Sequence, residues 1–124
     1  MRRISTGSPF EAKMGYSRAV VKGGWCFVSG VTGYDYATMV MPGDIAAQAR
    51  NCFSTIDAVL TDAGFTMDDI VRVQYTVTDV TLVDALVPVL GDALGEVRPA
   101  ATMVIAGLIR PEMLVEIEVT AFKG

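Results

Sequence analysis

The sequence predicts an α+β fold in which two helices cover one face of a single mixed β-sheet. Strand-like and helix-like segments follow one another in the order β-β-α-β-α-β-β, with room for an additional strand near the N-terminus. A chain of 124 residues is the length of one domain, so we expect residues 1–124 to fold as a unit. Two helices on one face of a sheet form a stable two-layer arrangement, which leaves the other face uncovered.

The first two strands are predicted to form a hairpin. Residues 17–22 have the composition of a strand, and Gly23 and Gly24 mark a turn. Residues 25–29 then resume a strand pattern. Residues 30–43 contain several glycines, a Met-Pro pair and two tyrosines, so they are predicted to be a loop.

The clearest element is a helix that begins after Asp44 and ends before Gly64. Asp44 is a typical N-cap residue, and glycine is a common residue just beyond the end of a helix. Between them, apolar residues recur at the spacing of one helical face. These residues are Ile45, Ala49, Cys52, Phe53, Ile56, Val59, Leu60 and Ala63.

The second half of the chain predicts a further strand and a second helix. Residues 71–77 alternate apolar and polar side chains, as a half-buried strand does. Thr81 and Asp84 form a weak capping box for a helix that runs to about Leu94. Pro88 lies inside this helix, where its ring removes a hydrogen bond, so we expect a kink or a restart there.

The last two strands have different patterns. Residues 100–105 are continuously apolar apart from Thr102, which predicts a strand covered on both faces. The final strand alternates, with Val115, Ile117, Val119 and Ala121 on one face and Glu116, Glu118 and Thr120 on the other. The two glutamates are therefore expected on the face that points away from the core.

The chain is unusually apolar for its size. Hydrophobic residues make up 52% of it and the mean hydropathy is +0.43. A domain of this size buries only about two-thirds of its unfolded surface, so we expect part of the apolar surplus at a subunit interface, with a large core as the alternative. No apolar run approaches the ~18 residues that a membrane span needs. The N-terminus lacks the apolar stretch of a secretory signal, and the expected location is the cytoplasm.

Charge and residue content exclude several functions. The net charge of −4 and the sequence pI of about 4.6 disfavour binding to nucleic acid, because an acidic surface repels phosphate. The chain contains no histidine, which excludes a Ser-His-Asp triad, a Cys-His dyad and a histidine metal site. Cys26 and Cys52 lack metal-ligand spacing and are expected to be buried thiols. No metal or organic cofactor is expected, since there is no glycine-rich phosphate loop either.

Four blocks of sequence carry a resemblance to a known family. They are Gly15–Val20, Phe27–Gly30, the helix from Gln48 to Gly64, and Arg98–Ala100 followed by Leu114–Glu118. Their order and spacing along nearly the whole chain resemble the RidA (YjgF, endoribonuclease L-PSP) family of reactive-intermediate deaminases. The resemblance implies a chorismate-mutase-like fold and a homotrimer whose sheets surround a central barrel, with clefts between neighbouring subunits. It also implies hydrolysis of 2-imino or 2-enamino acids to 2-oxo acids and ammonia, without cofactor or metal.

The resemblance assigns roles to particular residues. Glu116 matches the glutamate credited with activating water, whereas the pattern alone also allows a solvated strand carboxylate. From its own chemistry, Tyr16 can donate its hydroxyl to a substrate or stack over it, with an ordinary half-buried aromatic as the alternative. Ser29 and Gly30 close a strand at the expected cleft, where a backbone N–H can meet an anion because glycine permits close approach, although a turn glycine fits equally. Glu118 matches a second family acid and is expected in the barrel or the interface.

Three other positions depart from the family pattern. Ala101 stands where deaminating members have an arginine that pairs with the substrate carboxylate, and a methyl group cannot replace it. Val87 replaces a cleft asparagine, and Met103 replaces a cysteine often found near the arginine. The three changes together predict an altered ligand.

Arg18, Arg98 and Arg110 are the candidate replacement cations. For each of them, however, the sequence favours an exposed surface arginine.

Two functions remain open at this point. One is hydrolysis of an imine or enamine, with a substrate other than a simple 2-imino acid. The other is a trimer that binds a small ligand or stabilises proteins without catalysis. The ribonuclease activity in the older family name is ranked last, because the chain is acidic and has no histidine.

Overall fold

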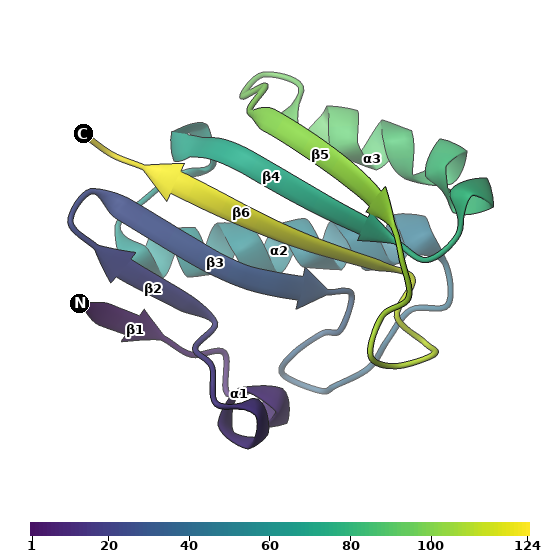
Figure 1. Cartoon of the computed structure of the whole chain (residues 1–124), viewed down its shortest axis with the longest axis horizontal. Helices are drawn as coiled ribbons and strands as arrows, with labels where there is room; N and C mark the ends of the chain where they lie inside the picture. The colour runs from purple at the N-terminus through teal and green to yellow at the C-terminus, as the bar shows by residue number, and fades with distance from the viewer.

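The computed structural model describes residues 1–124 and contains one six-stranded sheet in the order β1-β2-β3-β6-β4-β5 (Figure 1). Neighbouring strands are antiparallel except β4 and β5, which are parallel. The predicted mixed sheet is confirmed, including the additional N-terminal strand. The strands are β1 Arg2–Ile4, β2 Ala19–Lys22, β3 Trp25–Thr32, β4 Ile70–Val77, β5 Ala100–Ile105 and β6 Val115–Phe122.

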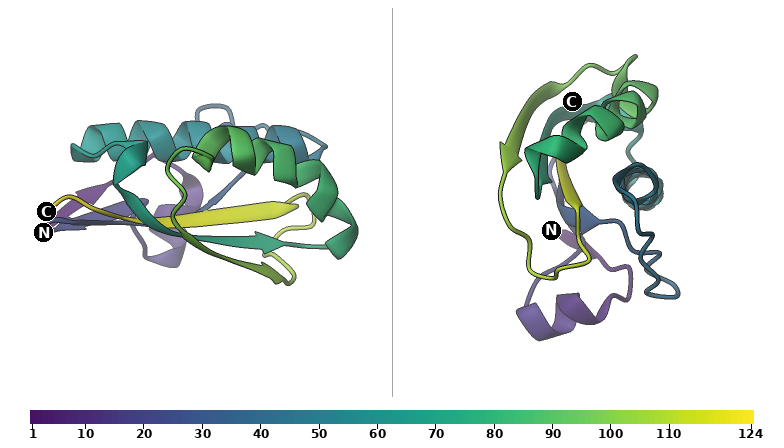
Figure 2. Two further views of the ribbon diagram at one scale, coloured as in Figure 1. Left: turned by 90° about the horizontal axis from the view of Figure 1, so that it is seen from above. Right: turned by 90° about the vertical axis from the view of Figure 1, so that its right-hand side faces the viewer.

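Helices α2 (Ile45–Ala63) and α3 (Val83–Leu94) form one layer on one face of the sheet (Figure 2). This is the two-layer arrangement that the sequence predicts. A short helix, α1 (Pro9–Met14), lies beside the start of β2 and was not predicted. Single 3₁₀ turns, η1 (Met67–Asp69) and η2 (Val80–Leu82), precede β4 and α3.

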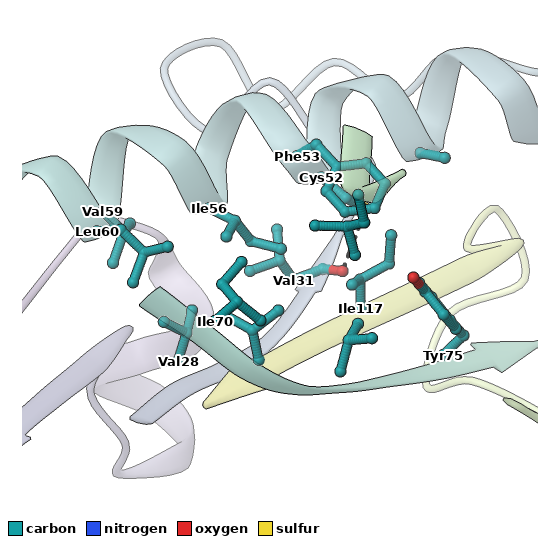
Figure 3. Packing of buried hydrophobic residues seen from close by; sticks show 14 of the residues in the cluster. Val28, Val31, Cys52, Phe53, Ile56, Val59, Leu60, Ile70, Tyr75 and Ile117 are labelled. Carbon is teal, nitrogen blue, oxygen red and sulfur yellow. Dashed lines mark hydrogen bonds between the residues drawn. The ribbon is translucent and has the colours of Figure 1, made fainter. Parts of the chain in front are cut away.

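Helix α2 begins and ends as predicted. The Asp44 side chain accepts a hydrogen bond from the Ala47 N–H at 3.1 Å. Gly64 ends the helix with a φ of 85°, a left-handed conformation that glycine adopts without a steric penalty. The apolar face of α2 packs mainly on β3 and β6, and the side chains of Ile56 and Leu60 point toward the sheet there (Figure 3). None of the helices combines the length and the apolar character that a membrane span requires.

The boundaries of two other elements differ from the prediction. Strand β3 continues to Thr32 instead of ending at residue 29, because β6 still pairs with it beyond the glycine. Asp79, not Thr81, provides the cap before the second helix, and its carboxylate accepts the Thr81 N–H at 2.8 Å. Helix α3 then runs through Pro88 without a restart.

Strand β5 was expected to be covered on both faces, and in the single chain it is not. It is an edge strand that pairs only with β4, and Met103 is its only residue that is not exposed. Val104 and Ile105 are 40% and 49% exposed. The face of the sheet opposite the helices also exposes the aromatic side chains of Trp25, Phe27 and Phe122. Much of the apolar surplus in the composition therefore lies on surface that one chain leaves uncovered.

Candidate active site

The centre of the candidate site is a β-bulge in β3. Val28 pairs with Val119 and Val31 pairs with Ile117, so three steps along β3 match two along β6. Ser29 and its neighbour Gly30 supply the extra residue. A bulge of this kind bends the strand and takes backbone groups out of the regular ladder.

Glu116 lies on the uncovered face of β6, as its alternation with the buried Val115 and Ile117 predicted. Its carboxyl group rests on Gly30, since a Cβ built on Gly30 would lie 2.5 Å from the Glu116 carboxyl carbon. Only glycine leaves room for this approach. Burial, and then the nearby charge of Glu118, raise the pKa of Glu116, although the charge of Arg18 opposes them.

Arg18 is buried, with 1% of its surface exposed, so the expectation of a surface arginine is wrong for this residue. Its Nη1 donates to the carbonyl oxygens of Gly30 at 2.8 Å and Ser29 at 3.4 Å. The guanidinium carbon lies 5.7 Å from the ring centre of Tyr16 and 5.0 Å from that of Tyr36. A guanidinium enclosed in this way is poorly placed to bind a substrate carboxylate.

Tyr16 is half-buried just before β2, and burial raises the pKa of its hydroxyl. Tyr36, the other ring beside Arg18, was not singled out from the sequence. Its hydroxyl accepts the Thr32 N–H at 3.2 Å and lies 3.1 Å from the Thr32 hydroxyl. Tyr36 lies in an irregular loop, where no periodic pattern indicates which way a side chain points.

Tyr16 and Ser29 also line a hollow of about 540 Å³ on the uncovered face. The Ser29 hydroxyl donates to the Ser17 carbonyl, which ties the segment before β2 to the bulge. Across the hollow, Arg72 and Glu118 contribute charged side chains. Glu118 is exposed there, on the face where a barrel or interface role was expected.

A second group of predicted residues lies elsewhere. Val87 and Ala101 line a groove of about 590 Å³ between α3 and β5. Met103 follows on the same face of β5 and is half-buried. Arg98 also lines this groove, so among the candidate cations it is the one placed beside Ala101. The other lining residues are Val73, Tyr75, Leu90, Gly91, Leu94, Gly95 and Pro99.

The two groups point to opposite faces of the sheet. Ala101 pairs with Val73, which pairs with Val119, and the last two are buried under the helices. Glu116 pairs with Thr76 on the uncovered face. Within one chain, the structure therefore brings Tyr16, Arg18, Ser29, Gly30 and Glu116 together, and places Val87, Ala101 and Met103 apart from them. Arg110 belongs to neither group, since it lies over Phe10 with its guanidinium carbon 5.8 Å from the ring centre.

The cysteines are buried, as predicted. The Cys52 thiol donates to the Val31 carbonyl at 3.3 Å, and burial raises the pKa of both thiols. No three Cys, Asp or Glu side chains converge in a way that could hold a metal ion.

The sequence model described as endoribonuclease L-PSP matches residues 6–123. The chain belongs to this family. A RutC family protein of Pyrococcus horikoshii is 30% identical over 87% of this chain and 86% of its own.

Solved structures of the endoribonuclease L-PSP family agree with this assignment. A member of the YjgF/YER057c/UK114 family from Mycobacterium tuberculosis is 40% identical over 98% of both chains, with a TM-score of 0.90. RidA from an Antarctic Psychrobacter is 29% identical over 99% of both chains, with a TM-score of 0.88. The family resemblance and the fold that it implies are therefore confirmed.

Proposed function

We propose that this family member hydrolyses the C=N bond of an imine, or of the enamine tautomer, to a carbonyl compound and ammonia. The observation that carries the proposal is the half-buried carboxyl group of Glu116, held on Gly30 beside the bulge with its pKa raised. Family membership, with a RidA protein among the similar structures, supports the same reaction. Water and protein groups supply every atom and proton that it needs, so no metal or organic cofactor is proposed.

Glu116 is the proposed acid and base in this reaction. Its carboxylate takes a proton from the water that attacks the imine carbon, and the nitrogen receives a proton to give a carbinolamine. When the C–N bond breaks, Glu116 transfers the proton of the carbinolamine hydroxyl to the nitrogen, which leaves as ammonia while the carbonyl forms. A carboxyl group with a raised pKa is better matched to both transfers near neutral pH than an ordinary one.

Other groups near the bulge would bind the substrate. Tyr16 has a hydroxyl that is suited to donate to the substrate or a ring that can stack on it. The Ser29 N–H already donates to the Arg18 carbonyl at 2.9 Å, which leaves the Gly30 N–H as the candidate donor to a substrate oxygen or anion. Arg18 is not proposed as the replacement for the family arginine, because its guanidinium is enclosed.

We further propose that the complete site requires two chains. Glu116 and Ala101 face opposite sides of the sheet, so a cleft that contains both needs a second copy. In a homotrimer built around a central barrel, Glu116 of one subunit would face the Val87–Ala101 groove of its neighbour. The proposed partners are a small imine or enamine and two further copies of this chain. The proposed location is the cytoplasm, and neither nucleic acid nor a membrane is proposed as a partner.

We expect a trimer in solution, because an exposed apolar edge strand and three exposed aromatic side chains are costly to leave in water. Light scattering should give close to three times the chain mass of 13.2 kDa. Phe27→Glu on the uncovered face should lower this mass, whereas Arg50→Glu on the exposed side of α2 should not. A monomer mass for the unaltered protein at micromolar concentration would refute the shared cleft.

The proposed reaction is tested by ammonia release from a panel of imines with and without a carboxylate, measured as a function of pH. Glu116 must be ionised to act as a base, and its pKa lies above the usual 4.5. The rate should therefore fall on acidification, and the midpoint of this acidic limb of the pH profile should lie above pH 4.5. Glu118→Gln should move this limb to lower pH, because Glu118 raises the pKa of Glu116.

Binding without catalysis is the second candidate, and the apolar residues Val87 and Ala101 favour it. It would be established if no imine in the panel released ammonia while some of them raised the melting temperature of the protein. The acidic charge and the lack of histidine leave ribonuclease activity without support.

A further inference from the structure

Arg18 is the largest fully buried side chain in the protein, and it has no ion-pair partner. The single salt bridge of the molecule joins Arg2 and Asp62 on the surface. Taking a guanidinium out of water without a carboxylate beside it is costly, so other contacts must offset that cost. The Nε of Arg18 has no hydrogen-bond partner at all, which leaves its charge only partly compensated.

The contacts of Arg18 are two carbonyls and two aromatic rings. The carbonyls belong to Ser29 and Gly30, the residues at which the register of β3 and β6 shifts. Buried backbone acceptors need a hydrogen-bond partner, and Arg18 supplies one to both. The faces of Tyr16 and Tyr36 are within the range of cation–π attraction. Arg18 thus links the bulge to the two tyrosines.

The bulge in turn determines where the Glu116 carboxyl group lies. That group is seated against Gly30, whose carbonyl oxygen is 2.8 Å from Nη1 of Arg18. A change in the position of Gly30 would therefore move the carboxyl group.

The charge of Arg18 also affects the ionisation of nearby carboxyl groups. Arg18 lowers the pKa of Glu116 on β6 and of Glu11 on α1, yet neither carboxylate is within 4.0 Å of it. Glu118 on β6 opposes this effect at Glu116, and the charge of Glu116 in turn raises the pKa of the Cys52 thiol on α2.

We propose that Arg18 is a positioning residue. It fixes the Ser29–Gly30 bulge, against which the Glu116 carboxyl group packs, and it keeps a positive charge near that carboxyl group. Its effect on turnover rests on the proposed function of Glu116. Its effect on the bulge and on the ionisation of Glu116 does not, and both are measurable without a substrate.

The test compares Arg18→Met, which removes the charge and the donors, with Arg18→Lys, which keeps the charge but loses the planar fork that reaches both carbonyls. Carboxyl-carbon NMR should show Glu116 titrating at higher pH in Arg18→Met than in the unaltered protein, and close to the unaltered value in Arg18→Lys. In both variants the Ser29 amide should exchange with solvent about 2- to 10-fold faster, since one lost hydrogen bond is worth roughly 0.5–1.5 kcal/mol and the bulge has few others. Arg110→Met removes a guanidinium that lies over Phe10 and not at the bulge, and it should change neither measurement.

Where an imine substrate is turned over, kcat should fall about 10- to 100-fold in Arg18→Met, as expected for a misplaced base, while KM changes by less than about threefold. A folded Arg18→Met protein with unchanged Glu116 titration and kcat would overturn the proposal. If Arg18→Met does not fold, unchanged Ser29 exchange in Arg18→Lys would overturn it. If Glu116 titration and Ser29 exchange are altered but no imine is turned over, the proposed function is refuted and the positioning role of Arg18 still stands.

Discussion

Replacing Glu116 by glutamine is expected to lower ammonia release by about 100-fold or more, the usual contribution of a general base. The amide has nearly the shape of the carboxyl group and still fits on Gly30, but it cannot take a proton from water. The fall should appear in kcat under saturating substrate, with the acidic limb of the pH profile lost. Circular dichroism and light scattering should match those of the unaltered protein.

Two further variants separate chemistry from damage to the site. Gly30→Ala keeps Glu116 but adds a methyl group that would lie 2.5 Å from the present position of the Glu116 carboxyl carbon. The carboxyl group must therefore move, and turnover should fall although the base is present. Glu96→Gln, on an exposed residue beyond the end of α3, should leave the rate unchanged. If Glu116→Gln matched the unaltered protein on every imine that is turned over, Glu116 would have no part in the mechanism.

The second large effect is expected at Ala101. The unaltered protein should show weak activity, or none, on 2-aminoacrylate and similar small 2-imino acids, because no arginine stands at this position. Ala101→Arg should raise that activity by about 10- to 150-fold, since a hydrogen bond to a charged group is worth roughly 1.5–3 kcal/mol. Ala101 is exposed in a groove of about 590 Å³, which has room for the longer side chain. The measurement is kcat/KM for 2-imino acids against that for uncharged imines.

Neighbouring positions provide the controls for this experiment. Thr102→Arg places the same charge on the opposite face of β5 and should give no gain. Arg98 lines the groove and could already pair with a carboxylate, in which case Arg98→Ala would remove whatever 2-imino acid activity exists. Strong turnover of 2-aminoacrylate by the unaltered protein that survives both Arg98→Ala and Arg18→Ala would contradict the interpretation of Ala101.

The sequence by itself determined the features that depend on local periodicity. The apolar spacing after Asp44 predicted helix α2 with both of its ends, because caps and helical faces are encoded within a few residues. Alternation around Val115 and Ile117 placed Glu116 on the face away from the core, since the side-chain period of a strand is two. The family blocks then indicated which of the outward-facing glutamates to test.

Only the tertiary structure decided the features that depend on pairing between distant segments. A glycine at the end of a strand pattern predicts a turn. In the structure β6 pairs with β3 on both sides of Gly30, so this glycine lies in a β-bulge instead. Arg18 was expected on the surface by its residue type, yet the bulge carbonyls and the ring of Tyr36 enclose it. The separation of Glu116 from Ala101 on opposite faces follows from the register in which β4 pairs with β6 and β5, strands that are distant in sequence. Such contacts leave no local signal, because each is made with a partner twelve or more residues away.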